Sequence, residues 1–456
     1  MSKKGELVLR CFLPIAAAVL VVPLPQAAEA RSAEAARPAA TSLAREIAQR
    51  SGDLFPFYAA RANAPLWLSP AGQPSAAVAA LFDKLRTAQL DNVDTAALQL
   101  DQVSKLVDKA RRGGASDVAQ ADLALSRAFV RYVQAMRGTN HADMIYVDAP
   151  LQPGVPNPRA ILDPAAMAGS LEQYIADMAW MQPLYAPMRK ALADPSYTHS
   201  QREQIATNLA RLRAIPGGLT GRYILVDADS ATLWMYENGK PVDSMKVVVG
   251  KPELPTPMMA GYVRYAIVDP YWQVPPDLVQ NSIAANVLER GVGYLKSGGY
   301  QVLADWDDNA PVLDPKKIDW KAVRNGTLQV HVRQLPGREN FMGKVKFEFP
   351  NPKGIYLHDT PQRDLLAKDA RQYSSGCVRL EDAQRLGVWL MKGPLPTSKT
   401  PEKRVSLPEP VPVFITYLTA SPDSSGQIAF HADPYKRDGA AQLAIAETGG
   451  PKTDRP

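Results

Sequence analysis

Residues 354–382 read GIYLHDTPQRDLLAKDARQYSSGCVRLED, and this stretch determines which chemistry the sequence predicts. A strand-like run ends at His358, and Cys377 follows within the turn-forming run Ser374-Ser375-Gly376-Cys377. A thiol with an ordinary pKa of about 8.5 is mostly un-ionised at neutral pH and needs a neighbouring base. The imidazole of His358 can accept the proton and stabilise the thiolate as an ion pair. The pattern therefore predicts a cysteine nucleophile with a histidine base.

The residues that flank Cys377 add to this prediction. Gly376 permits a tight turn, so that backbone N–H groups can point at a developing oxyanion. A helix is expected to begin near 381–382, and its N-terminal end adds positive dipole character nearby. Arg379 can hold a carboxylate in a bidentate grip or fix the loop. A buried, unreactive cysteine is the simpler interpretation of each feature alone, but together the features favour catalysis.

Residues 1–30 are typical of a signal peptide, with a basic start, an apolar stretch at 11–25 and a small-x-small cleavage site at 28–30. We therefore expect export to the periplasm and removal of this segment. The chain has two cysteines, and cleavage discards Cys11, which leaves Cys377 without a partner for an internal disulfide. No later apolar run approaches the ~20 residues of a membrane span, so no transmembrane span is expected after cleavage.

Composition excludes several classes of protein. The 456 residues are 46% hydrophobic and 21% charged, as expected for two or three globular domains. The net charge of +6 is scattered, without a basic stripe interleaved with aromatic residues, which argues against nucleic acid as a partner. The five histidines form no HExxH-like cluster, which argues against a zinc peptidase; a thiol enzyme needs neither a metal nor an organic cofactor, so none is expected. No serine has a lysine three positions on, which excludes the usual serine D,D-transpeptidases.

The hydrophobic pattern changes once along the chain. Apolar residues recur at helical spacing within 78–90, 120–137 and 201–215. Strand-like runs begin after Pro216-Gly217-Gly218, and Asn238-Gly239 between two of them is a strong hairpin signal. Further strands are expected, among others, at 262–268, 327–333, 345–349, 354–358 and 411–418, and a helix is expected at 278–290.

These patterns predict an α+β fold: a mainly α-helical N-terminal scaffold domain followed by a β-rich catalytic domain with a helical, lid-like insertion. The predicted segments are a signal peptide at 1–30, the helical domain at 31–215, the catalytic domain at 216–446, the insertion at about 276–345 and a disordered tail at 447–456.

His358 together with Ser374-x-Gly376-Cys377-Val378-Arg379 resembles the signature of the L,D-transpeptidases, the YkuD-domain enzymes that remodel peptidoglycan. Other parts of the chain resemble the large Gram-negative branch of that family, so that the resemblance covers most of residues 50–445. The segments that carry it are Tyr356 to Pro361, Pro270 to Pro275, Val413 to Tyr417 and, in the scaffold domain, Phe57-Tyr58 and Pro65-Leu66-Trp67.

The resemblance implies that Cys377 is the nucleophile and His358 the general base, with the backbone at Gly376 and Cys377 as the oxyanion site. It also implies a substrate groove lined by Tyr356, Ser374, Arg379 and Trp272. Three departures are evident. Ser375 stands where many members have histidine, and Arg379 stands where many members have asparagine, although arginine occurs in the large branch. The run Tyr185 to Asp194 leads almost directly into the helix at 201–215, which leaves no room for a peptidoglycan-binding module.

The implied reaction is peptidoglycan L,D-transpeptidation. Cys377 would form a thioester with a tetrapeptide stem and release D-Ala, after which an amine of a second stem would attack to cross-link two third residues. Such an enzyme serves peptidoglycan biosynthesis, cell wall organisation and cell shape, is a carbapenem target, and has stem peptides and cell-wall synthesis proteins as partners. Two alternatives stay open: an L,D-carboxypeptidase that uses water, and a catalytically weak wall-binding scaffold protein.

Overall fold

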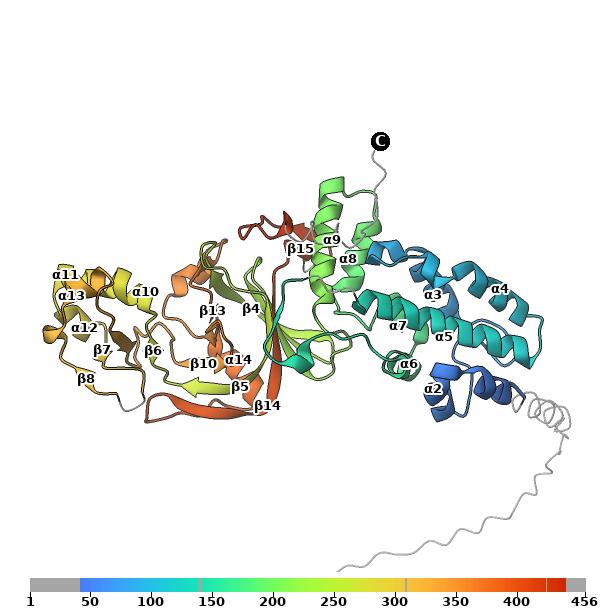
Figure 1. The fold of residues 1–456 in the computed structure, drawn as a ribbon, viewed down its shortest axis with the longest axis horizontal. Coiled ribbons are helices and arrows are strands. Elements are labelled where there is room, and N and C mark those ends of the chain that lie inside the picture. Colours follow the sequence, from blue (N-terminus) through green and yellow to red (C-terminus); the bar gives the residue numbers. More distant parts are fainter. Residues whose placement is uncertain (1–41, 139–141, 308–309, 424, 440–456) are drawn as a thin grey trace, which may run out of the picture.

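The computed structural model describes residues 42–138, 142–307, 310–423 and 425–439. A helical N-terminal region is followed by a strand-rich region, which confirms the α+β prediction (Figure 1). The predicted signal peptide and C-terminal tail lie outside the described residues. Within the described ranges, no helix is long and apolar enough to cross a membrane.

The helical region forms because apolar residues recur on one face of each helix. The three stripes identified from the sequence lie in or around α3, α5 and α9. Residues 42–50 are helical, and the elements after them are η1 (Gly52–Leu54), α2 (Phe55–Ala60), α3 (Ala76–Arg86), η2 (Ala88–Asp91), η3 (Ala96–Leu98), α4 (Leu100–Ala110), α5 (Ala115–Gly138), η4 (Ala149–Leu151), α6 (Pro158–Met167), α7 (Leu171–Ala176), α8 (Tyr185–Ala193) and α9 (His199–Arg213).

A buried carboxylate on α5 organises the start of the helical region. Asp122 is fully buried and accepts hydrogen bonds from the N–H groups of Leu66, Trp67 and Leu68 at 2.8–3.1 Å. The Tyr58 hydroxyl donates to the same carboxylate at 2.6 Å. Buried polar groups of this kind are retained only when they are hydrogen-bonded. The motif residues Tyr58 and Leu66-Trp67 therefore fasten their loop to α5.

We expect Asp122→Ala to lower the free energy of unfolding of the helical region by about 3 kcal/mol, because four buried donors lose their acceptor. Urea unfolding followed by tryptophan fluorescence measures this. The matched control is Asp83→Ala, which removes an exposed ion pair with Arg86 and should change the value by less than about 0.5 kcal/mol. Equal losses in the two variants would contradict this role of Asp122.

The strand-rich region is built on a sheet that closes on itself. The strands follow the order β5-β10-β11-β13-β4-β3-β2-β14, and β14 pairs with β5 as well as with β2. Because the sheet closes on itself, these strands do not form an open edge. The strands are β2 (Arg222–Asp227), β3 (Thr232–Glu237), β4 (Lys240–Gly250), β5 (Met259–Val268), β10 (Val345–Glu348), β11 (Leu357–His358), β13 (Val378–Leu380) and β14 (Lys403–Thr416).

The remaining elements of this region flank the closed sheet. The predicted hairpin is confirmed, because Asn238 and Gly239 both have positive φ between β3 and β4, as a type I′ turn requires. The flanking elements are β1 (Ile145–Tyr146), η7 (Arg363–Ala367), β12 (Gln372–Ser374), α14 (Ala383–Met391), β15 (Ala420–Pro422) and β16 (Ile428–Phe430).

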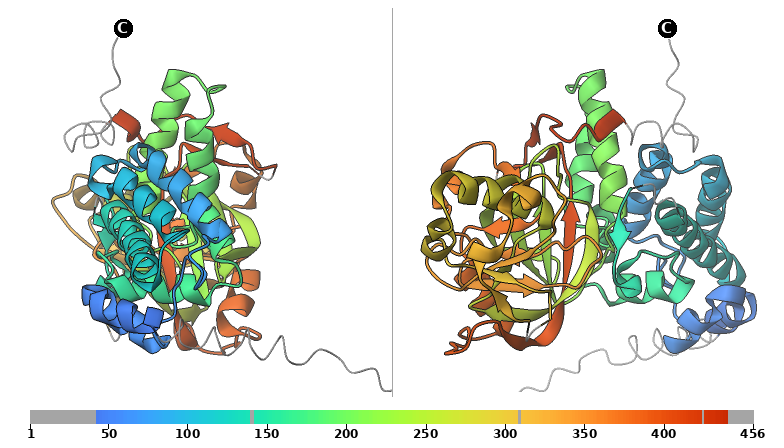
Figure 2. Two further views of the ribbon diagram at one scale, coloured as in Figure 1. Left: turned by 90° about the vertical axis from the view of Figure 1, so that its right-hand side faces the viewer. Right: turned by 60° about the vertical axis from the view of Figure 1, so that its left-hand side comes forward.

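A separate subdomain is inserted between β5 and β10. Its sheet has the order β6-β9-β7-β8, and its helices pack on a small apolar core of their own. The right-hand view of Figure 2 shows this insertion and the helical region on opposite sides of the closed sheet. Its elements are β6 (Trp272–Gln273), α10 (Pro276–Leu278), η5 (Val279–Ile283), α11 (Ala284–Arg290), α12 (Gly293–Ser297), β7 (Tyr300–Leu303), β8 (Val312–Leu313), η6 (Pro315–Lys317), α13 (Trp320–Arg324) and β9 (His331–Gln334).

Two predictions need correction within the insertion. The predicted strand at 327–333 begins only at His331, because the N–H groups of Thr327 and Leu328 bond back to Ala322 O at the end of α13. The predicted helix at 278–290 starts at Pro276 and contains the π-helical segment η5.

The helical region also contributes directly to the sheet. Strand β1 pairs in parallel with β5, and Asp148 just after it forms an ion pair with Arg264 of β5 at 2.6 Å. Buried Arg137 at the end of α5 donates to Ile215 O at 2.9 Å, close to the point where the strands begin. The two regions are therefore joined by main-chain pairing and by buried polar contacts.

Candidate active site

The turn that carries Cys377 is held by the side chain of Ser374. Ser374 Oγ donates to Cys377 O at 2.6 Å and accepts from Gly376 N–H at 3.1 Å. Gly376 has φ +110°, a conformation that a side chain would strain, and a Cβ there would lie 3.1 Å from Ile355 Cδ1. Serine and glycine are therefore needed at these two positions for the turn that presents the thiol.

Thr256, which the sequence did not mark as a site residue, supports this turn through hydrogen bonds. Thr256 is fully buried, and its Oγ1 donates to Gly376 O at 2.8 Å. The same oxygen accepts from Gly250 N–H, also at 2.8 Å. No motif marks Thr256 in the sequence, because its partners lie at the end of β4 and in the distant turn at 374–377.

The candidate base lies on the strand beside the turn. β11 pairs in parallel with β13, with Leu357 opposite Val378 and His358 opposite Arg379. Cys377 immediately precedes Val378, so the register brings thiol and imidazole into the same neighbourhood. His358 is buried, and its Nδ1 lies 2.6 Å from Asp359 O. A carbonyl oxygen can only accept, so Nδ1 carries the proton and Nε2 is left as the basic nitrogen.

The main chain that fixes this tautomer is itself anchored. The Asp359 carboxylate forms an ion pair with Arg363 at 2.6 Å and accepts from Lys344 N–H at 2.9 Å. Gly343 lies so close that a Cβ there would be 2.4 Å from the Asp359 side chain. These contacts hold the segment that orients His358, and sequence reasoning did not single out any of them.

The pKa shifts of the Cys377 thiol and the His358 imidazole both favour the neutral forms. Burial and the neighbouring cations Arg379 and Lys346 lower the pKa of His358 to about 3. Burial raises the pKa of the Cys377 thiol, and the backbone of Tyr356 and the same two cations offset this only in part. Both shifts act against a thiolate–imidazolium ion pair in the resting site, although Cys377 itself is only half-buried.

Two cations lie on the strands around the pair. Arg379 of β13 hydrogen-bonds Gln362 Oε1, which fixes the guanidinium beside the turn. Lys346 of β10 forms ion pairs with Glu402 at 2.9 Å and Glu348 at 3.4 Å. Its Nζ also lies 5.4 Å from the ring centroid of Tyr356, within reach of a cation–π contact.

Most of the predicted site residues lie on β11, β12 and β13 or in the segments next to these strands. Ser375 lies exposed on the turn itself. Trp272 lies on β6 of the insertion, where it packs on Phe341 at 4.6 Å and on Tyr300 at 6.5 Å between ring centroids. Among the residues that the structure describes, no group of three potential ligands could hold a metal ion.

We expect Cys377 to be alkylated slowly at neutral pH, with a single rise centred above the ordinary thiol value of about 8.5. The sign follows from the raised pKa, since the reactive thiolate forms only when the pH approaches it. Iodoacetamide labelling of Cys377 against pH measures the midpoint, and the urea-unfolded protein is the matched control with an ordinary thiol. A plateau already reached at pH 6 would show that an ion pair exists after all.

Two family profiles match this chain, each over one of its regions. The profile of the L,D-transpeptidase catalytic domain, YkuD, matches residues 221–415, and that of the scaffold domain matches residues 52–192. A protein of Haemophilus influenzae whose name places it among the L,D-transpeptidases is 30% identical over 402 residues, which cover 85% of this chain and 78% of that protein.

Two solved structures overlap with the chain only weakly. They are an L,D-transpeptidase from Mycobacterium smegmatis, at 14% identity, and the Ldtfm–avibactam carbamoyl enzyme, at 15% identity, each with a TM-score of 0.22. The matches cover 42% and 48% of this chain, and they span 58% and 63%, less than two thirds, of the two structures. Overlap at this TM-score supports no structural conclusion.

Proposed function

Since this chain belongs to the L,D-transpeptidase family, we propose that it is a cysteine-dependent peptidoglycan L,D-transpeptidase of the periplasm. The observation that carries the proposal is the pairing of β11 with β13, which places His358, with Nε2 free, beside the strand that follows Cys377. A base next to a nucleophile and oriented by a third group is the arrangement that covalent acyl transfer requires.

In the first half-reaction, Cys377 Sγ attacks the carbonyl of the third residue of a tetrapeptide stem. His358 Nε2 takes the thiol proton as the C–S bond forms and then gives it to the amine of the departing D-Ala. In the second half-reaction, an acceptor-stem amine attacks the thioester, loses its proton to His358 and regenerates the thiol. The product is a cross-link between two third residues.

The pKa shifts of His358 and Cys377 constrain the order of the proton transfer and the attack. With the pKa of His358 near 3, a complete proton transfer before attack is unfavourable. The proton therefore moves as Sγ bonds to carbon, when the negative charge passes to the substrate oxygen. Asp359 O accepts from Nδ1–H at 2.6 Å and stabilises the imidazolium that forms at that moment.

The oxyanion and the substrate carboxylate need separate partners. The Gly376 N–H already donates to Ser374 Oγ, so we assign the first oxyanion contact to the Cys377 N–H. Arg379 lies one strand position beyond Val378 and faces the same neighbourhood. Its guanidinium can bind the terminal carboxylate of the donor stem. We keep Tyr356 as a wall of this groove and the insertion, with Trp272, as a lid over it.

Water as the acceptor would make the same site an L,D-carboxypeptidase, and a weakly active wall-binding protein is the other alternative. Incubation with tetrapeptide muropeptides, followed by mass spectrometry of the products, separates these possibilities. We expect a dimer that lacks one D-Ala, and no dimer with Cys377→Ala. His358→Gln, which keeps a side chain of similar size, should lower the rate at least about a hundredfold.

Other outcomes of this assay would contradict the proposal. A tripeptide product alone would identify a carboxypeptidase. Unchanged substrate with the native chain would favour the wall-binding scaffold, and a full rate for Cys377→Ala would exclude the thiol as nucleophile.

We also expect a carbapenem to acylate Cys377, because its strained ring gives an acyl donor that needs no leaving amine. Intact-mass measurement after incubation should show one adduct on the native chain and none on Cys377→Ala. Asp83→Ala, an exposed change on α3 away from the candidate site, should keep the adduct. An unchanged mass of the native chain would count against a nucleophilic Cys377.

A further inference from the structure

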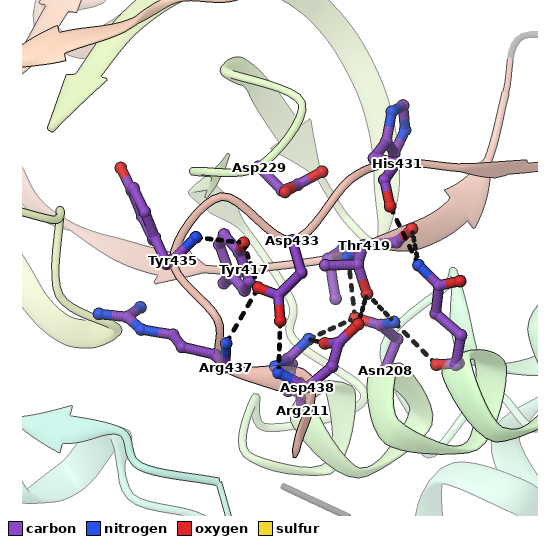
Figure 3. A network of polar contacts seen from close by, with 12 residues as sticks. Asn208, Arg211, Asp229, Tyr417, Thr419, His431, Asp433, Tyr435, Arg437 and Asp438 are labelled. Carbon is purple, nitrogen blue, oxygen red and sulfur yellow. Dashed lines mark hydrogen bonds and ion pairs between the residues drawn. The ribbon is translucent and has the colours of Figure 1, made fainter. Parts of the chain in front are cut away.

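The segment from His431 to Asp438, here called the C-terminal strap, lies between helix α9 and the closed sheet. Figure 3 shows its side chains directed to both sides, toward Asn208 and Arg211 of α9 and toward Tyr417 at the end of β14. It follows the short β15–β16 hairpin and is the last part of the chain that the structure describes before Gly439.

On the helix side, the strap is fixed by a buried ion pair. Arg211 of α9, 3% exposed, contacts Asp438 at 2.7 Å. Gln204, about two helical turns before Arg211 on α9, donates its side-chain N–H to His431 O at 3.1 Å. Charge-assisted bonds of a buried guanidinium are among the stronger polar contacts in proteins. The strap is therefore firmly attached to the helical region.

Within the strap, one carboxylate holds the backbone in place. Asp433 accepts from the N–H groups of Arg437 at 2.9 Å and Asp438 at 2.8 Å, and from the Tyr417 hydroxyl at 2.6 Å. The Tyr417 and Tyr435 rings are stacked, with centroids 4.9 Å apart and an angle of 13° between their planes. These contacts determine where the Tyr435 hydroxyl points.

On the sheet side, the Tyr435 hydroxyl begins a chain of hydrogen bonds to the turn at 374–377, here called the nucleophile turn. Tyr435 OH donates to Gly250 O at 2.5 Å, and Gly250 N–H donates to Thr256 Oγ1 at 2.8 Å. Thr256 Oγ1 in turn donates to Gly376 O at 2.8 Å. A continuous chain of hydrogen bonds thus runs from the strap to the residue before Cys377.

We propose that Thr256 and Tyr435 are positioning residues that hold the Gly376 carbonyl, and with it the thiol of Cys377, in the geometry that attack requires. The strap extends this support to α9, so that the helical region braces the nucleophile turn. The catalytic part of this inference rests on the proposed transpeptidase function. The placement of the thiol does not, since the thiol can be probed without a substrate.

The turn at 374–377 is fixed internally by Ser374 and is joined to the end of β4 at both of its sides. Lys251 N–H donates to Ser374 O at 2.9 Å before the turn, and Thr256 Oγ1 links the Gly376 carbonyl, next to Cys377, to Gly250. Without that bond the buried Gly376 carbonyl would lose its hydroxyl donor and the turn would shift toward solvent. A shift of about 1 Å in a reacting group can cost a hundredfold in rate.

The deciding measurement is the pH midpoint of Cys377 alkylation in Thr256→Val, which keeps the shape of the side chain and removes the hydroxyl. Because burial raises the pKa of this thiol, release of the turn should lower the midpoint by about half a unit or more. Thr256→Ser keeps the hydroxyl and should restore the native midpoint. Thr416→Val is the matched control, since Thr416 Oγ1 is buried without a hydrogen-bond partner among the described residues.

Tyr435→Phe provides a second variant in case Thr256→Val does not fold, because the ring stack on Tyr417 remains. It should shift the midpoint in the same direction. If the muropeptide assay detects cross-linking, both variants should lower kcat about tenfold or more with KM within about twofold, as expected for lost positioning rather than lost binding.

A native midpoint in Thr256→Val and Tyr435→Phe would overturn the inference, even if kcat fell. An equal shift in Thr416→Val would also overturn it, because any loss of a buried hydroxyl would then suffice. A shifted midpoint in a protein that makes no cross-link would support the positioning role while the proposed function fails. The two failures are therefore distinguishable.

Discussion

The parallel register between β11 and β13 is the constraint on which the candidate site depends. With Leu357 opposite Val378, the imidazole and the turn that carries Cys377 fall on the same side of two adjacent strands. Because side chains alternate along a strand, a slip by one residue would turn His358 to the other face. Neighbouring strands β10 and β4 fix this register from both sides, and the closed sheet holds those strands in turn.

The pKa shifts of the thiol and the imidazole both favour the neutral forms. A thiolate would be the form most readily oxidised, and a chain whose one described cysteine is free has no partner to protect it. Burial raises the pKa of the Cys377 thiol, whereas the nearby cations Arg379 and Lys346 lower it; in the proposed mechanism these cations favour the negative charge that develops during attack. The same cations lower the pKa of His358. They therefore favour negative charge in the site but make the imidazole a weaker base.

The sequence predicted the parts of the structure that depend on neighbouring residues. Gly376 and Asn238-Gly239 reveal their turns because only certain residues tolerate positive φ, and helical spacing reveals α3, α5 and α9. It could not predict Thr256 or Lys346, whose roles arise from contacts between segments far apart in the sequence. Nor could it predict the pKa shifts of His358 and Cys377, because these depend mainly on burial in the folded protein. Trp272 shows that a motif-like residue can belong to a neighbouring subdomain.

The two regions of the chain are coupled through the sheet and not merely connected in sequence. The helical region contributes β1 to the edge of β5, and α9 holds the strap that reaches Gly250 and Thr256. A chain in which no binding module separates helix α8 from α9 has few other elements that could brace the nucleophile turn from outside the closed sheet. Under the positioning proposal, the helical region therefore supports the backbone beside Cys377 as well as contributing a strand to the sheet.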